Sequence, residues 1–296
     1  MSVPAAFIGI ILIWSTTPLA IKWSSEEVGF LFGLSARMLL GVVICLSLIA
    51  VLRQPFKWHQ QARHTYLAAG LGLYFAMLSV YWGAQYISSG LVAVVYGLLP
   101  MLTFFVSALM LGDSLRQPGK LLGAGLGFAG LLIVFKPQDS ISVMAVAGVA
   151  AVFTSATIHA VSMVWVKRIG AEISALSVTT GALLVALPLY VGTWLLFDGR
   201  LPAQLSDKTL GAIVYLGVMG SVIGFIAFYY ALKHVSANAI ALITLITPVL
   251  ALALGYWLNH EALSAEIAFG TAFILSGLVL HNWGEKFFNR RVSLSL

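Results

Sequence analysis

The chain has 296 residues, of which 60% are hydrophobic and only 9% are charged, and its mean hydropathy is +1.00. A soluble domain carries about 25% charged residues, so this composition argues against a soluble protein and favours one surrounded by lipid. The net charge of +6 does not indicate a nucleic-acid partner, because nearly all of the basic residues lie in the connections between long apolar segments.

Ten apolar segments can be placed along the chain, and most reach the roughly 20 residues that a helix needs to cross a bilayer. In chain order they are residues 4–22, 28–52, 65–85, 89–111, 119–136, 141–166, 174–197, 209–232, 236–258 and 265–284. Every Asp and Glu lies in a connection or at the edge of a segment. The sequence therefore predicts an all-α membrane protein with ten transmembrane helices.

The basic residues between these segments are shared unevenly between the two sides of the membrane. Eleven lie on the side that holds both termini: Arg53, Lys57, Arg63, Arg116, Lys120, Lys167, Arg168, Lys233, Lys286, Arg290 and Arg291. Four lie on the opposite side: Lys22, Lys136, Arg200 and Lys208. Because Lys and Arg accumulate in short cytoplasmic loops, this bias places both termini in the cytoplasm.

The two halves of the chain match each other at a nearly constant offset. At 148 positions the pairs are Tyr81 and Tyr229, Ser88 and Ser236, Pro100 and Pro248, and Asp113 and Glu261; at 147 positions they are Gly123 and Gly270, and Gly130 and Gly277. Each half holds five segments, an odd number, so the second copy would enter the membrane inverted. We therefore expect two inverted five-helix repeats, residues 1–137 and residues 138–296, the second ending in a short cytoplasmic tail.

Two prolines, Pro100 and Pro248, fall near the middle of the fourth and ninth segments. A proline inside a helix removes one backbone hydrogen bond and bends the helix, which here would free the carbonyl groups of Tyr96 and Thr244. In lipid a free carbonyl must face protein, water or a ligand. Two interpretations stay open: static kinks that a neighbouring helix satisfies, or paired hinges whose carbonyls face a substrate cavity.

Arg37 is the only formally charged side chain well inside a segment. Its burial costs roughly 2.5–3.5 kcal/mol on insertion scales, so it needs a partner, either protein carbonyls or a substrate carboxylate. His159 is the only histidine deep in a segment, and its spacing places it on one helix face with Ser155. His159 is either a core histidine with a protein partner, or a cavity ligand or proton carrier.

Further candidates for substrate contact lie on polar or aromatic stripes of the predicted helices. They are Trp14, Ser15 and Thr17 in the first segment, Tyr74 and Tyr81 in the third, Tyr96 in the fourth and Thr244 in the ninth. Isolated hydroxyl groups in membrane helices usually bond to their own backbone or to a neighbouring helix. Only the convergence of several stripes would therefore make them a binding site.

Several motifs of known chemistry are absent from the sequence. No Asp or Glu lies in the middle of a segment, so the usual carboxylate proton relay is missing. No phosphate-binding GxxxxGK[ST] loop and no HExxH zinc motif occurs. Cys45 is the single cysteine, which excludes an intrachain disulfide. We expect no catalytic residue, no cofactor and no metal ligand, and a membrane-embedded enzyme is a distant alternative.

Taken together, these features resemble the drug/metabolite transporter superfamily, specifically its EamA type with two five-helix repeats. The residues that carry the resemblance are Trp14 and Ser15, Arg37, Pro100 followed by Asp113, and Pro248 followed by Glu261. Family members more often have Glu where this chain has Asp113. Within the superfamily the chain looks most like the YddG group of exporters of aromatic and related amino acids, which implies amino acid export across the bacterial inner membrane.

A zwitterionic amino acid suits the residue inventory. Its carboxylate could meet Arg37 or His159, and its ammonium could meet freed carbonyls, hydroxyls and aromatic faces, the last worth up to about 2 kcal/mol when desolvated. The rival substrate class is small lipophilic or cationic compounds, exported by a multidrug or metabolite efflux carrier. Without a carboxylate inside the membrane, we expect facilitated diffusion, by alternating access, through a monomer in the lipid bilayer.

Overall fold

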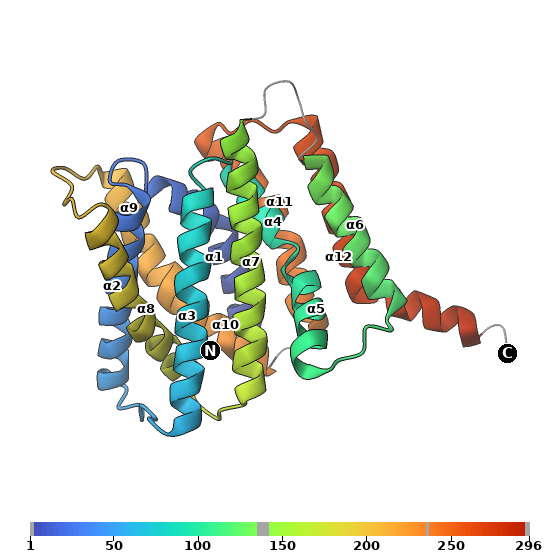
Figure 1. Cartoon of the computed structure of the whole chain (residues 1–296), viewed down its shortest axis with the longest axis horizontal. Helices are drawn as coiled ribbons and strands as arrows, with labels where there is room; N and C mark the ends of the chain where they lie inside the picture. The colour runs from blue at the N-terminus through green and yellow to red at the C-terminus, as the bar shows by residue number, and fades with distance from the viewer. Residues whose placement is uncertain (1–2, 135–141, 235–236, 294–296) are drawn as a thin grey trace.

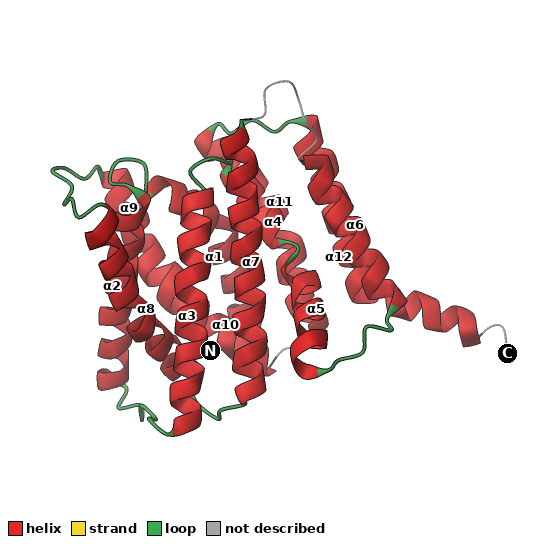
Figure 2. Ribbon diagram, in the orientation of Figure 1, coloured by secondary structure: helices red, strands yellow, loops and turns green. Residues whose placement is uncertain are grey.

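The computed structural model describes the backbone of residues 3–134, 142–234 and 237–293, and the side chains of these residues except 3, 232–242 and 285–293. Throughout these ranges the regular structure is helical, and none of it is strand (Figure 2). The prediction of an all-α protein is therefore confirmed for the residues that the structure describes.

Each predicted segment coincides with one helix or with consecutive helices. The first half forms α1 (Val3–Trp23), α2 (Phe30–Val51), α3 (Gln60–Gly83), α4 (Ser89–Tyr96), α5 (Leu99–Leu111) and α6 (Pro118–Val134). The second half forms α7 (Val143–Ile169), α8 (Ala175–Phe197), α9 (Asp207–Tyr215), the π-helix η1 (Leu216–Ile223), α10 (Gly224–His234), α11 (Ala237–Asn259) and α12 (Ala265–Ser293).

Membrane crossing is supported by length and composition. Among the described residues, eight helical segments are long and apolar enough to cross a bilayer, and α4 with α5, and α9 with η1 and α10, each count as one of them. Two shorter apolar helices complete the set, Pro118–Val134 and Ile243–Asn259. The chain is a multi-pass membrane protein.

The two mid-segment prolines lie in different local structures. The fourth segment is interrupted, because α4 ends at Tyr96 and α5 begins at Leu99 with Pro100 in its first turn. A fixed φ and a missing N–H suit a proline to that position. In contrast, α11 runs without interruption through Pro248. The disturbance predicted at each proline is therefore present as a break before Pro100, whereas at Pro248 the helix continues.

The helices stand side by side, and their connections form two faces (Figure 1). The connections after α1, α3, α8 and α11 lie at the top of Figure 1, here called the upper face; those after α2, α5 and α7 lie at the bottom, here called the lower face. Helix α3 packs against both α7 and α8, while α1 packs against α10 and α11. The pair α6 and α12 forms one edge of the bundle.

Glycines bring α6 and α12 together. A side chain on Gly130 would meet the Gly270 carbonyl at 2.6 Å, and one on Gly277 would meet the Gly123 carbonyl at the same distance. These are the glycines that the two halves share, and small residues allow membrane helices to approach closely. The edge pair is therefore held by backbone-to-backbone packing.

The packing of the two halves follows a matching scheme. The five spans of each half can be numbered in order, so that each span of the first half has a counterpart in the second. The contact of α3 with α7 then has its counterpart in the contact of α10 with α1, and the contact of α3 with α8 has its counterpart in that of η1 with α2. In the same way, α5 with α7 corresponds to α11 with α1. All of these pairs of helices are in contact.

Candidate functional site

Arg37 on α2 is the most unusual group in the interior, because only 1% of its surface is exposed. Its Nε and Nη2 atoms donate to the hydroxyl of Ser221 at 3.2 and 3.1 Å, and Nη1 donates to the hydroxyl of Tyr81 at 3.2 Å. Among the described side chains, the ion pairs are Lys22 with Glu261 and Lys208 with Glu26, so Arg37 faces no carboxylate there. Among the described residues its hydrogen-bond partners are hydroxyl groups, and its Cζ atom lies 5.8 Å from the centre of the Tyr81 ring.

The local structure of η1 explains how Ser221 reaches Arg37. A π-helix is a rare conformation that is common at functional sites. A side chain on Gly217 would overlap the Leu40 side chain at 2.6 Å, and one on Gly220 would lie 3.1 Å from the Arg37 Nη2 atom. The two glycines therefore let η1 lie directly on α2, with the Ser221 hydroxyl against the guanidinium.

Two further tyrosines join α3 to α8 near this point. The Tyr190 hydroxyl donates to the Leu73 carbonyl at 2.7 Å, and the Tyr74 hydroxyl lies 2.7 Å from the Thr193 hydroxyl. The Thr193 hydroxyl donates to the Leu189 carbonyl, so Tyr74 is the donor to Thr193. The rings of Tyr74 and Tyr190 lie 5.1 Å apart. In this conformation Tyr74 stabilises a helix contact.

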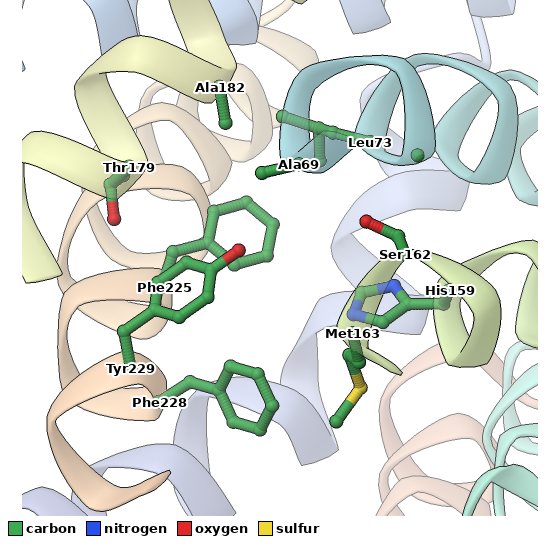
Figure 3. Close-up of a pocket in the computed structure, with 11 residues that line it drawn as sticks. Ala69, Leu73, His159, Ser162, Met163, Thr179, Ala182, Phe225, Phe228 and Tyr229 are labelled. Carbon is green, nitrogen blue, oxygen red and sulfur yellow. The ribbon is translucent and has the colours of Figure 1, made fainter. Parts of the chain in front are cut away.

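A cavity lies between α3, α7, α8 and α10 (Figure 3). It is lined by Ala69, Gly72, Leu73, His159, Ser162, Met163, Thr179, Ala182, Phe225, Phe228 and Tyr229. The space open to the centres of water-sized spheres is about 20 Å³. One water needs about 10–15 Å³ by this measure, so the cavity in this conformation is too small for an amino acid.

His159 borders this cavity and faces the aromatic side chains of α10 (Figure 3). No hydrogen bond joins its ring to another described residue, whereas the neighbouring Ser162 hydroxyl donates to the Ala68 carbonyl at 3.0 Å. The imidazole is perpendicular to the Tyr96 ring, with their centres 6.4 Å apart. A polar ring at a cavity wall that has no hydrogen-bond partner among the described residues is available to a ligand.

Tyr96 and Ser155 form a short chain of hydrogen bonds behind His159. The Ser155 hydroxyl donates to the Ala76 carbonyl at 2.5 Å, so it accepts from the Tyr96 hydroxyl, which lies 2.6 Å away. The chain joins α4, α7 and α3 at the point where α4 ends. The predicted stripes on the fourth and sixth segments therefore converge.

The candidates on the first and ninth segments do not line the cavity. The hydroxyls of Ser15 and Thr17 donate to the carbonyls of Ile11 and Ile13 on their own helix, each at 2.6 Å. The Trp14 ring packs against Phe228, with centres 5.0 Å apart, and so supports the cavity wall. Thr244 is buried on α11.

Several residues of the site are not among those predicted from the sequence, Ser221 and Tyr229 among them. Ser221 lies in an apolar segment, and nothing in its sequence context indicates that a π-helix turns it toward Arg37. Tyr229 could have been found, because the repeat pairs it with Tyr81, the residue that contacts Arg37. Pro248 lies beside the break between α4 and α5, because a side chain added at Gly97 would lie 3.6 Å from the Pro248 Cγ atom.

Comparison with known proteins gives consistent matches along most of the chain. The model of the EamA-like transporter family matches residues 2–136 and again residues 146–283. An uncharacterized transporter of Archaeoglobus fulgidus is 25% identical over 272 residues, which cover 91% of this chain and 95% of the relative. The uncharacterized transporter YoaV of Bacillus subtilis is 22% identical over 288 residues, covering 96% and 97%.

Two further similarities have less specific descriptions. Protein PagO of Salmonella typhimurium is 23% identical over 271 residues, which cover 90% of this chain and 88% of the relative. A solved crystal structure superposes with a TM-score of 0.67 at 22% sequence identity, covering 97% of this chain and 98% of the other. This superposition supports the fold.

Proposed function

The chain belongs to the EamA-like transporter family, and we propose that this member exports neutral amino acids, aromatic ones among them, by alternating access. The family and the similar proteins are transporters, not enzymes, so a membrane-embedded enzyme is no longer an alternative. The observation that carries the choice of substrate is Arg37, a buried cation without a carboxylate partner among the described side chains.

A substrate carboxylate suits Arg37 because the guanidinium has five N–H donors and its described contacts use three of them. Charge-assisted hydrogen bonds to a carboxylate are about twice as strong as those to neutral hydroxyls. The Ser221 and Tyr81 hydroxyls hold the guanidinium in place when no substrate is bound. They can remain bonded to it, or turn toward the substrate, when a carboxylate arrives.

The cavity between α3, α7, α8 and α10 is the proposed other half of an amino acid site. Phe225, Phe228 and Tyr229 form an aromatic wall opposite His159 (Figure 3). Aromatic faces bind both an ammonium group and an aromatic side chain. A phenylalanine-like substrate would place its ring against this wall, with His159 as a hydrogen-bonding partner and its carboxylate toward Arg37.

Opening of this small cavity requires a change of conformation. Two inverted repeats would provide it, because each half could adopt the conformation of the other. The proposal of inverted repeats is supported by the two successive family matches and by the equivalent helix contacts. The break between α4 and α5, which lies beside Pro248, is the proposed hinge.

The orientation follows from the charge bias of the loops. We place both termini in the cytoplasm of a bacterial cell and the protein in its inner membrane. The lower face is then cytoplasmic. A reporter enzyme that is active only in the periplasm, fused after Leu296, should be inactive; an active fusion would overturn the orientation.

The substrate assignment is tested with purified protein in proteoliposomes. Exchange of labelled phenylalanine should be competed by unlabelled phenylalanine and other neutral amino acids, and much less by phenylalaninamide, which lacks the carboxylate. A cationic dye is the comparison for the alternative, a multidrug efflux carrier. If the dye were transported and phenylalanine were not, that alternative would replace the present proposal.

A further inference from the structure

A partly buried acid joins three helices at the upper face. The Glu261 carboxylate accepts hydrogen bonds from the Ser89 backbone at 3.0 Å, the Ser89 hydroxyl at 2.8 Å and the Gly90 backbone at 3.3 Å. It also accepts from the Asn259 amide at 2.9 Å and lies 3.9 Å from the Lys22 ammonium. Glu261 therefore fixes the end of α11 to the first turn of α4 and to the end of α1.

The backbone at the end of α11 aims Glu261 at this position. His260 has a left-handed conformation with φ of 50°, and the Glu261 N–H donates to the Gly255 carbonyl at 3.1 Å. A side chain on Gly255 would come within 2.9 Å of the Ser89 hydroxyl and would overlap the Glu261 carboxylate. The turn and the glycine together create the space in which the acid reaches back to α4.

Electrostatics favours this contact. The first N–H groups of a helix have no partner inside the helix, and the positive end of the helix dipole attracts an anion. Burial of the carboxyl tends to raise the pKa of Glu261, but hydrogen bonds from Ser89, Asn259 and Gly90 outweigh it and hold that pKa below its ordinary value. Glu261 is therefore ionised when it binds α4.

Neighbouring contacts strengthen the same closure. The Lys22 ammonium donates to the Ile87 carbonyl at 2.8 Å, just before α4. The Trp23 indole donates to the Asn259 side chain at 2.9 Å. The end of α1, the start of α4 and the end of α11 are thus joined by polar contacts at the upper face.

The equivalent acid of the first half, Asp113, makes no such contact with the residues whose side chains the structure describes. Asp113 follows the left-handed Gly112, with φ of 75°, as Glu261 follows His260. Asp113 is exposed and makes no hydrogen bond or ion pair with a described residue. Glu261 binds the start of α4, and the equivalent element in the second half is α11, which starts at Ala237. The equivalent contact of Asp113 would therefore be with the start of α11.

We propose that Glu261 is a positioning residue that holds the upper face closed by binding the start of α4, and that Asp113 holds the lower face closed by binding the start of α11 in the opposite state. The inference rests on the proposed alternating access, and not on the identity of the substrate. Each acid is engaged in one state only, so the two acids bias the equilibrium between the states in opposite directions.

The test measures which face gives access to the cavity. A reporter thiol is placed in the cavity by Ala182→Cys in a Cys45→Ala background, and a membrane-impermeant maleimide is added to one side of proteoliposomes without substrate. The exposed Leu201, in the connection at the upper face, gives by Leu201→Cys a separate reporter of orientation. The rate of labelling then reports the fraction of molecules open on the treated side.

Glu261→Gln should raise labelling from the upper face about tenfold, because several hydrogen bonds to a charged group are weakened. Ser89→Ala removes one of these bonds and should give a smaller rise. Asp113→Asn should lower labelling from the upper face. Glu26→Gln, which removes an exposed acid paired with Lys208 on the same face, is the matched control and should change nothing.

Opposite shifts for the two acids would not arise if both merely stabilised the fold. Equal labelling of folded Glu261→Gln and parent protein would overturn the proposal, as would a shift of both acid variants in the same direction. If Glu261→Gln does not fold, Ser89→Ala decides by the same measure. Opposite shifts in a protein that fails to transport phenylalanine would support the acids' role and refute the substrate assignment alone.

Discussion

Arg37 and Ser221 lie on α2 and η1, 184 positions apart in sequence, yet two guanidinium nitrogens share the single Ser221 hydroxyl. One neutral oxygen gives a buried cation only part of the stabilisation that a carboxylate would. The contact therefore holds the guanidinium in position and leaves it able to gain from an incoming anion.

Arg37→Gln should weaken binding of phenylalanine by about tenfold to a hundredfold, because a hydrogen bond to a charged group is worth about 1.5–3 kcal/mol. Binding of phenylalaninamide should change little. Isothermal titration of purified protein, or inhibition of exchange, measures both. An equal loss for phenylalanine and its amide would show that Arg37 stabilises the helices instead of binding the carboxylate.

Gly220→Ala should also weaken phenylalanine binding, with less effect than Arg37→Gln. The added methyl group would lie 3.1 Å from the Arg37 Nη2 atom and would displace the guanidinium by a few tenths of an ångström. Gly211→Ala, on the same membrane span in open space, is the control and should bind as the parent does. Parental affinity in Gly220→Ala would contradict the proposed position of the carboxylate.

Gly123→Ala should destabilise the protein by about 1–3 kcal/mol, the usual cost of overfilling a packed contact. Its methyl group would overlap the Gly277 carbonyl at 2.5 Å. Gly125→Ala is matched in helix and substitution, and nothing lies within 4 Å of its new methyl group. Thermal unfolding in detergent should therefore show a lower Tm for Gly123→Ala only. Equal Tm values would mean that α6 and α12 can separate at no cost.

Pro248→Ala and Pro100→Ala should slow transport more than they lower the yield of folded protein. Pro100 starts α5 after the break, and Pro248 lies beside that break, so both substitutions allow straighter helices at the proposed hinge. Exchange rates per folded molecule measure the effect. Variants that transport at the parental rate would identify the prolines as static features of the fold.

The protein should equilibrate labelled phenylalanine across vesicles and should not concentrate it when an inward proton gradient is imposed. The described membrane-spanning segments carry no acid in their middle that could take up a proton there, and His159 serves as a binding group. His159→Gln, which keeps a hydrogen-bonding side chain, should retain exchange. Accumulation above equality that depends on the proton gradient, and that His159→Gln abolishes, would instead make His159 the proton carrier.

Much of the fold was predictable because membrane helices are specified locally. In lipid the backbone must satisfy its own hydrogen bonds, so a long apolar run can form only a helix or a barrel strand, and its length is set by the bilayer. The ten segments follow from such local features. The importance of Arg37 could also be recognised from the sequence, because it is a charged residue in the middle of an apolar segment.

Only the tertiary structure decided which side chains meet. The approach of Ser221 to Arg37 depends on a π-helix, whose extra residue per turn leaves no periodic mark in an apolar segment. Pro100 lies in the first turn of a helix and Pro248 lies within one, although both stand near the middle of an apolar segment, and nothing in the sequence pattern separates the two cases. Ser15 and Thr17 satisfy their hydroxyls within their own helix, whereas Tyr96 and Ser155 satisfy theirs across three helices. A hydroxyl can bond either way at the same position in a helix, and the nearest acceptor on the adjoining helix decides between them.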